Sequence, residues 1–267
     1  MLVIIISLVL LVESSFAAPS NLIINGTDAS IEDFPFMISL RSYGGSHSCG
    51  GSILSKKWIL TAAHCVNAGT TPLTQTIQIG RTNISQTEDY SVYTIEQVIR
   101  HPNYTAGGSY RNDIAVVKLF DELQFSDTIQ PVKLPEPCFE VSENDNGVTL
   151  IGWGITDSGM VAETLQKVQY YVVPNEECNE LLWTTTIYPS QICAAYPGGG
   201  KGQCSGDSGG PLLHDGIQVG IVSWSIKPCT VAPYPGVLTK VSHHLPFIYE
   251  HTDLDSTGID LRSCDEI

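Results

Sequence analysis

Short apolar runs separated by turn residues dominate the chain after its N-terminal segment. Residues 52–60 place two such runs around Ser-Lys-Lys and predict a hairpin, while the unbroken apolar run 114–117 predicts a strand buried on both faces. Runs rich in β-branched and aromatic residues at 148–151 and 168–172 predict two more strands. Residues 212–219 predict a second hairpin, because the central Asp-Gly suits a type I′ turn.

Helical patterns are few. Asn175 is a candidate N-cap for a short helix through residue 182, and a second short helix is expected at 247–251. No strand–helix–strand alternation occurs, which counts against an α/β fold and favours an all-β barrel or sandwich. The proline-rich stretch 131–137 is the expected linker between two barrels.

The N-terminal segment has a different pattern. Residues 2–12 are apolar apart from Ser7, a run too short to span a bilayer but typical of a secretory signal. Small residues at Ser15 and Ala17 predict cleavage after residue 17, although no Lys or Arg precedes the run. We therefore expect residues 1–17 to be a signal peptide, and a secreted, extracellular protein with no membrane partner.

Cysteine content and charge agree with export. Eight cysteines in an exported chain indicate four disulfides, and the alternative of a zinc site lacks any Cys-x-x-Cys or His-x-His cluster. Sequons at Asn25, Asn83 and Asn103 predict glycosylation. The formal net charge of −15 argues against nucleic acid and anionic membranes as partners.

Candidate chemistry begins at residues 206–211, which read Gly-Asp-Ser-Gly-Gly-Pro. Glycines on both sides of Ser208 allow positive φ and close approach of a substrate, but a serine hydroxyl needs a base to become a nucleophile. Two other interpretations stay open at this point. The segment could be an ordinary Gly/Pro surface turn, or the Gly-x-Ser-x-Gly elbow of an α/β-hydrolase.

Among seven histidines, His64 is the candidate base. It lies in Thr-Ala-Ala-His-Cys at 61–65, where small residues permit close packing and Cys65 can restrain it. We expect the others to be solvated or turn residues; they are His47, His101, His214, His243, His244 and His251.

From residue 23 to 250 the chain resembles the chymotrypsin/trypsin family of serine proteases. The matching motifs are Ile-Ile-Asn-Gly at 23–26, Cys-Gly-Gly-Ser at 49–52, Thr-Ala-Ala-His-Cys at 61–65, Asn-Asp-Ile-Ala at 112–115, Gly-Trp-Gly at 152–154, the 206–211 segment, Ser-Trp at 223–224 and Pro-Gly-Val at 235–237. The resemblance implies an all-β fold of two antiparallel six-stranded barrels joined near 121–137, with the active site between them and a short C-terminal helix.

The resemblance also implies catalytic roles. His64 is the general base and then acid, Asp113 orients it, and Ser208 is the nucleophile, with the backbone N–H groups of Gly206 and Ser208 as the oxyanion hole. The order His, Asp, Ser along the chain is that of this family and the reverse of the α/β-hydrolase order. Cleavage before Ile23 would free an α-amino group that pairs with Asp207.

That activation site has an unusual preceding residue. Relatives activated by trypsin-like enzymes carry Arg or Lys before the cut, whereas this chain has Leu22. We expect an activation peptide at 18–22, a protease domain at 23–253 and a C-terminal tail at 254–267. The activating enzyme would prefer apolar residues, and self-activation is one hypothesis.

Alignment with the family places Gly202 at the base of the primary specificity pocket. Trypsin-like members carry Asp there to hold Lys or Arg, whereas Gly202 and neutral Gln203 supply no charge for a buried cation. Ser225 and Gly236 align with the pocket walls, and the backbone of Ser223, Trp224 and Ser225 should pair with substrate. These positions predict chymotrypsin-like cleavage after Phe, Tyr, Leu or Met; elastase-like preference for small residues is the alternative.

Three disulfides are implied by the resemblance: Cys49–Cys65, Cys178–Cys193 and Cys204–Cys229. Cys138 and Cys264 remain, and we expect them to pair and to hold the tail at 254–267 against the body; two free or intermolecular thiols are the alternative. Val148 and His214 stand where relatives often have another bridged pair. Calcium is not expected, since Arg81 takes the position of an acidic ligand and leaves Glu88 and Asp89 as an exposed acidic loop.

We expect a monomeric zymogen that needs no cofactor or metal ion, acts on polypeptide substrates and is open to protein protease inhibitors. A non-catalytic homologue acting as a binding protein is the competing class. Such homologues usually lack the nucleophile or the base, and this chain keeps both.

Overall fold

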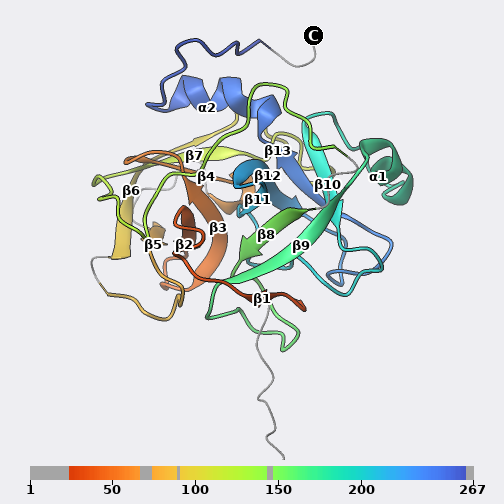
Figure 1. Cartoon of the computed structure of the whole chain (residues 1–267), viewed down its shortest axis with the longest axis horizontal. Helices are drawn as coiled ribbons and strands as arrows, with labels where there is room; N and C mark the ends of the chain where they lie inside the picture. Colours follow the sequence, from red (N-terminus) through yellow and green to blue (C-terminus); the bar gives the residue numbers. More distant parts are fainter. Residues whose placement is uncertain (1–23, 67–73, 89–90, 143–146, 263–267) are drawn as a thin grey trace, which may run out of the picture.

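The computed structural model describes residues 24–66, 74–88, 91–142 and 147–262 (Figure 1). Two β-barrels lie side by side, the first built from the red-to-yellow part of the chain and the second from the green-to-blue part. The last strand of the first barrel ends at Leu119, and the first strand of the second barrel begins at Val148.

The first barrel is closed and antiparallel, with strand order β2-β3-β4-β7-β6-β5. Its strands are β2 (Met37–Arg41), β3 (His47–Ile53), β4 (Trp58–Thr61), β5 (Thr76–Ile79), β6 (Val92–Arg100) and β7 (Ala115–Leu119). The predicted hairpin at 52–60 is confirmed, with Ser52 opposite Leu60. The apolar run from Ile114 to Val117 is fully buried, as its sequence indicates.

The second barrel closes because β8 pairs with both β9 and β11. Its strands are β8 (Val148–Gly152), β9 (Gln166–Val173), β10 (Gln191–Ala195), β11 (Pro211–His214), β12 (Ile217–Trp224) and β13 (Gly236–Lys240), and the short β1 (Thr27–Asp28) adds to β9. The β11–β12 turn has φ of 47° at Asp215 and 77° at Gly216, as a type I′ turn requires. The predicted all-β fold of two six-stranded barrels is confirmed.

The described residues include two α-helices, α1 (Asn175–Leu181) and α2 (Leu245–His251), and the short 3₁₀ helices η1 (Ala63–Cys65) and η4 (Ser242–His244). The expectation that Asn175 caps α1 is wrong, because Pro174 holds the N-cap position. The Asn175 amide instead donates to the carbonyls of Tyr188 (3.2 Å) and Gln191 (3.0 Å). A tertiary contact has replaced the local cap.

Disulfides tie three loops to the barrels: Cys49–Cys65, Cys178–Cys193 and Cys204–Cys229. Cys138 is also disulfide-bonded, but Cys264 lies outside the described residues, so their pairing stays a prediction. Val148 and His214 face each other across β8 and β11, as positions that relatives bridge should do. Leu254 and Leu261 of the tail pack on the first-barrel core.

At the N-terminal end of the described chain, Ile24 pairs with Gly202: the Gly202 N–H donates to the Ile24 carbonyl at 3.1 Å. The neighbouring Asn25 donates its side-chain amide to the Gly200 carbonyl at 2.8 Å. This part of the chain is therefore anchored beside the segment that was expected to form the pocket base. Within the described ranges, no helix has the length and apolar character needed to cross a membrane.

Candidate active site

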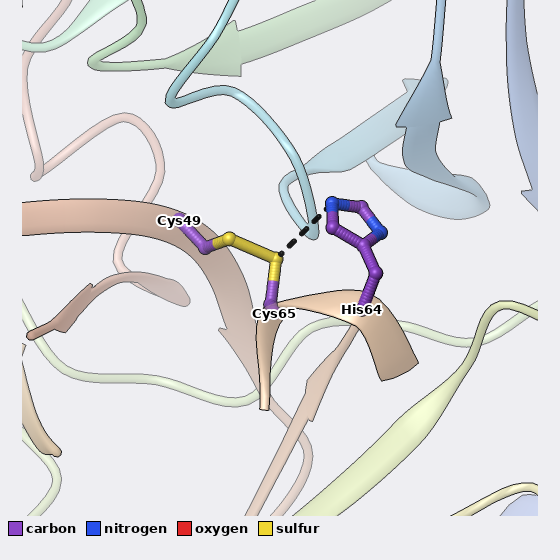
Figure 2. Close-up of side chains that lie close together, drawn as sticks. All are labelled: Cys49, His64 and Cys65. Carbon is purple, nitrogen blue, oxygen red and sulfur yellow. Dashed lines mark hydrogen bonds between the residues drawn. A yellow bond between two sulfur atoms is a disulfide. The ribbon is translucent and has the colours of Figure 1, made fainter. Parts of the chain in front are cut away.

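His64 is fixed by its neighbours in sequence and by a disulfide. Ala62 and Ala63 are fully buried, and their small side chains let η1 pack closely against the first barrel. Cys65 is bonded to Cys49 of β3, and Figure 2 shows the imidazole of His64 beside that bridge. The side chain of His64 keeps 24% of its surface exposed, so one edge of the ring faces solvent.

Asp113 precedes β7 and is completely buried between the barrels. Its Oδ1 accepts the backbone N–H of His64 at 2.9 Å, and its Oδ2 lies 2.6 Å from Nδ1 of His64. Ser223 at the end of β12 donates its hydroxyl to Oδ2, also at 2.6 Å. Both oxygens are thus satisfied by donors from the two barrels, and Nδ1 of His64 carries the hydrogen toward Asp113.

Ser208 shares a cavity with His64. The cavity has a volume of about 300 Å³, and its wall includes Tyr110, Trp224 and Ser225 as well as these two residues. Gly50 of β3 donates to the Ser208 carbonyl at 2.8 Å, so the serine loop spans both barrels. Among the described residues Ser208 forms no side-chain hydrogen bond, and Nε2 of His64 lies 3.7 Å from Sγ of Cys65 (Figure 2). In unliganded proteases, the hydroxyl–imidazole contact often tightens only with substrate.

The loop around Ser208 leaves two backbone donors free. The N–H groups of Asp207, Gly209 and Gly210 all donate to carbonyls, at 3.1, 2.8 and 3.0 Å. Within the described part of the chain, those of Gly206 and Ser208 have no acceptor. Positive φ at Gly206 (99°) and Gly209 (79°) produces this arrangement. Two adjacent free donors beside a serine can bind an oxyanion.

His47 holds the peptide group that joins Gly206 to Asp207. Its Nε2 lies 2.9 Å from the Gly206 carbonyl, and its Nδ1 lies 2.8 Å from the Ser39 hydroxyl, so the ring donates through Nε2 and accepts through Nδ1. Burial lowers the pKa of His47 to about 4, which keeps the ring neutral in this role. The expectation that His47 is solvated is wrong, and so is that for His244, which is 3% exposed.

Asp207 is completely buried and points away from Ser208. Its carboxylate accepts the N–H groups of Gly154 at 2.8 Å and Cys204 at 2.9 Å. A Cβ at Gly152 or Gly154 would overlap that carboxylate, which explains both glycines of the Gly-Trp-Gly motif. Burial raises the pKa of Asp207 to about 7 despite these two hydrogen bonds. Ile23, its expected partner, lies outside the described residues.

Of the predicted pocket residues, Gln203, Ser225 and Gly236 line cavities beside Ser208, whereas Gly202 is in the wall of neither cavity. Gln203 and Ser225 line the cavity of Ser208 and also a second cavity of about 450 Å³, whose wall includes Gly236. Gly202 has φ of 137°, and a Cβ there would overlap the hydroxyl oxygen of Tyr170. The pocket base therefore holds a tyrosine hydroxyl and a glutamine amide in place of a charged group.

The cluster of Cys49, His64 and Cys65 has its ligand-type atoms within 4.8 Å of one another. Both sulfur atoms belong to the disulfide drawn in Figure 2, so neither is a thiolate that could bind a metal ion. Arg81, at the position where calcium-binding relatives have an acidic ligand, forms an ion pair with Glu88 at 2.7 Å. Asp89 lies outside the described residues.

Sequence reasoning missed four residues of the site. Tyr110 packs edge-on against His64, with ring centroids 5.9 Å apart, and His47 and Tyr170 act as described above. Lys227 lines the Ser208 cavity with its Nζ 3.1 Å from the Ser205 hydroxyl. Only Tyr170 had a usable signal: the alternating pattern of 166–173 directs its side chain into the barrel, where a hydroxyl needs a partner.

Two closed antiparallel barrels, with a buried His–Asp pair and a serine on a glycine-rich turn between them, define the two-barrel class of serine proteases. A model of the trypsin family, described as Trypsin, matches residues 23–248. The chain belongs to this family, and its membership supports a serine endopeptidase.

Relatives from insects and a bird are similar over most of their length. Trypsin 5G1 of Aedes aegypti is 35% identical over 88% of this chain and 86% of its own. A trypsin of Phaedon cochleariae is 37% identical over 88% of this chain and 90% of its own. Trypsin II-P29 of Gallus gallus is 36% identical over 87% of this chain and 90% of its own.

Proposed function

We propose that this chain is a secreted serine endopeptidase that cleaves polypeptides after large uncharged residues, apolar or aromatic. The observation that carries the proposal is the doubly hydrogen-bonded contact between His64 and the buried Asp113, in the wall of the cavity that also holds Ser208. Asp113 orients the imidazole, leaving Nε2 as the basic atom on the exposed edge.

The reaction follows from these positions. The Ser208 hydroxyl attacks the scissile carbonyl while Nε2 of His64 takes its proton, and Asp113 stabilises the resulting imidazolium. The protonated imidazole then gives its proton to the leaving amine. Water next attacks the acyl group on Ser208 while Nε2 of His64 takes the proton from the water, and the imidazolium returns a proton to the Ser208 oxygen as the acid product leaves. Acid–base assistance of this kind typically contributes about 10²–10⁴-fold.

The free N–H groups of Gly206 and Ser208 would receive the negative charge of the tetrahedral intermediate. They are fixed before substrate arrives, because the carbonyls that share their peptide groups are held: Ile155 donates to the Ser205 carbonyl at 2.8 Å, and Gly210 donates to the Asp207 carbonyl at 3.0 Å. Preorganised donors are effective since no further reorganisation is needed in the transition state. Loss of one costs about 3–4 kcal/mol in related serine enzymes.

The preference before the scissile bond rests on the pocket base. The curated relatives are named trypsins, so cleavage after Lys or Arg is the competing preference. Here Gly202 supplies no carboxylate, and Lys227 adds a positive charge to the cavity wall. Among the described residues no acidic one lines the Ser208 cavity, and the one in the wall of the second cavity, Glu177, is exposed to solvent. A substrate cation buried beside Gly202 would therefore lack an opposite charge, at a cost of several kcal/mol.

One observation favours the second candidate, an elastase-like preference for small residues. The Gln203 amide lies across Gly236: a Cβ built on that glycine would be 2.6 Å from Cδ of Gln203. Together with the Ser225 side chain, this amide shortens the pocket.

A peptide library digested with the activated enzyme tests both preferences. We expect cleavage after Tyr, Phe, Leu and Met, and loss of all cleavage in Ser208→Ala. Dominant cleavage after Lys or Arg would overturn the uncharged preference, and dominant cleavage after Ala or Val would establish the elastase-like one.

Activation is part of the proposal. After removal of residues 1–17, a cut following Leu22 would free the α-amino group of Ile23 for the buried Asp207. Active enzyme incubated with the Ser208→Ala proenzyme should cut it after Leu22 if the enzyme activates itself. If that bond stays intact while a protease specific for apolar residues cuts it, self-activation is wrong and the zymogen proposal stands.

A further inference from the structure

The pocket base holds an amide oxygen with no hydrogen-bond partner. Gln203 is 3% exposed, and its Nε2 donates to the Trp224 carbonyl at 3.1 Å, which fixes the orientation of the amide. Its Oε1 is buried, and within the described residues it accepts no hydrogen bond. Leaving a buried acceptor unpaired costs free energy, so a ligand group that supplies a donor gains affinity.

A matching donor lies beside it. Tyr170 is 3% exposed, and its hydroxyl oxygen accepts the backbone N–H of Gln203 at 2.8 Å. A phenol also has one proton to donate, and no acceptor for that proton occurs among the described residues. Burial raises the pKa of Tyr170, so the hydroxyl keeps its proton in the working range of the enzyme.

Both groups border the space that a substrate side chain would enter. The cavity of Ser208 and the cavity behind it share Gln203 and Ser225 in their walls, and the second cavity adds Tyr170 and Gly236. The Gln203 Oε1 atom would lie 2.7 Å from a Cβ built on Gly236, at the floor of this joint space. The wall of this space therefore includes one side chain with an unpaired acceptor and one with an unused hydroxyl proton.

We propose that Gln203 and Tyr170 form a hydroxyl-binding subsite that selects tyrosine over phenylalanine before the scissile bond. A hydroxyl satisfies both groups, because it donates to Gln203 and accepts from Tyr170. The phenyl ring of phenylalanine would leave both unsatisfied while filling the same space. A lysine ammonium only donates, and it would share the cavity with the Lys227 cation.

A glutamine amide also donates and accepts, but tyrosine buries a larger apolar surface on the way to the base. The subsite rests on the proposed function, because it takes the joint cavity to be the primary pocket. Sites that hydrogen-bond a substrate hydroxyl discriminate strongly against analogues that lack it.

The test uses the activated enzyme and peptides that differ only before the scissile bond, with Tyr, Phe, Leu, Gln or Lys there. We expect kcat/KM for Tyr to exceed that for Phe by about 10–100-fold, an effect of roughly one or two hydrogen bonds. Gln203→Leu and Tyr170→Phe should each bring the Tyr/Phe ratio to within about threefold of unity. Tyr93→Phe and Gln97→Leu on β6 of the first barrel are matched controls that should leave it unchanged.

Titration of active sites with a fluorophosphonate in each variant separates a misfolded pocket from a lost preference, since only correctly folded molecules are counted. Equal kcat/KM for Tyr and Phe in the unaltered enzyme overturns the subsite, as does a ratio that survives both substitutions or a stronger preference for Gln. Dominant cleavage after Lys defeats the proposed function itself, so the two failures are distinct.

Discussion

Asp113 and Asp207 are both completely buried carboxylates, yet they are held in different ways. Asp113 has donors from both barrels, including an imidazole that can become its cationic partner. Asp207 has two backbone N–H groups and no ion pair within the described residues, and burial raises its pKa to about 7. The pocket base resembles Asp207, since the Oε1 atom of Gln203 accepts no hydrogen bond within the described residues. We infer that the fold supplies every partner of the catalytic carboxylate Asp113. Asp207 and Gln203, by contrast, gain a partner only on activation or on substrate binding.

The largest effect is expected when the negative charge of Asp113 is removed. Asp113→Asn should lower kcat by about 10⁴, the loss that this substitution causes in a related protease, because the amide favours the wrong imidazole tautomer. Folding should persist, since an amide oxygen can still accept the His64 backbone N–H. Steady-state kinetics on one peptide substrate measures it. A fall of less than 100-fold would mean that this carboxylate is only structural.

The second prediction concerns Asp207 in the uncleaved Ser208→Ala proenzyme. Its folded pKa of about 7 lies above the unfolded value of 3.8, so the folded state holds the proton more tightly. Ionisation therefore destabilises the proenzyme progressively as pH rises from about 4 to about 7, by a total on the order of 4 kcal/mol.

Asp207→Asn removes this dependence. The difference in unfolding free energy between the Asn variant and its parent should grow in favour of the variant across that range, as denaturant titrations at pH 4 and pH 8 would show. After cleavage following Leu22 the sign should reverse, because the new α-amino group favours the ionised carboxylate. A difference that does not vary with pH would contradict the raised pKa of the Asp207 carboxyl in the proenzyme.

The third prediction addresses the floor of the pocket. Gly202→Ala should cost about 3 kcal/mol of unfolding free energy or more, because a Cβ would overlap the Tyr170 hydroxyl at φ of 137°. Gly159→Ala is the control: its φ is 77°, but nothing lies within 4 Å of the added carbon, so only the cost of about 1–2 kcal/mol for the backbone remains. Equal losses of unfolding free energy in the two variants would show that the Tyr170 hydroxyl can accommodate a Cβ at position 202.

By the same geometry, an acidic residue introduced at 202 should not give Lys or Arg specificity.

The smallest effect is expected at Ser223. Ser223→Ala removes one of three hydrogen bonds to Asp113, which should lower kcat about tenfold with little change in KM, because the substrate backbone contacts stay. Ser190→Ala, another buried serine, is the control and should leave both constants unchanged. A rise in KM with constant kcat would place Ser223 in substrate binding alone.

Local patterns in the sequence predicted much of the fold. The Asp-Gly turn before β12 and the apolar run at β7 follow from period and turn chemistry, and both are confirmed. His64 could be singled out because small residues and a cysteine surround it.

Burial set by tertiary contacts could not be predicted in this way. His244 is buried, and His47 has both ring nitrogens hydrogen-bonded to Ser39 and Gly206, contacts that neighbouring residues in the sequence do not indicate. Asn175 has a capping side chain, but carbonyls near β10 compete for it. The Tyr170 contact joins residues 33 positions apart, so no local pattern reports it.

The most direct test of the account is covalent labelling of the activated protein with a fluorophosphonate, read by intact mass and peptide mapping. We predict one label per molecule, on Ser208, with labelling abolished in Ser208→Ala and slowed by orders of magnitude in Asp113→Asn. An activated protein that takes up no label at Ser208 would contradict the catalytic assignment and identify the chain as a binding protein.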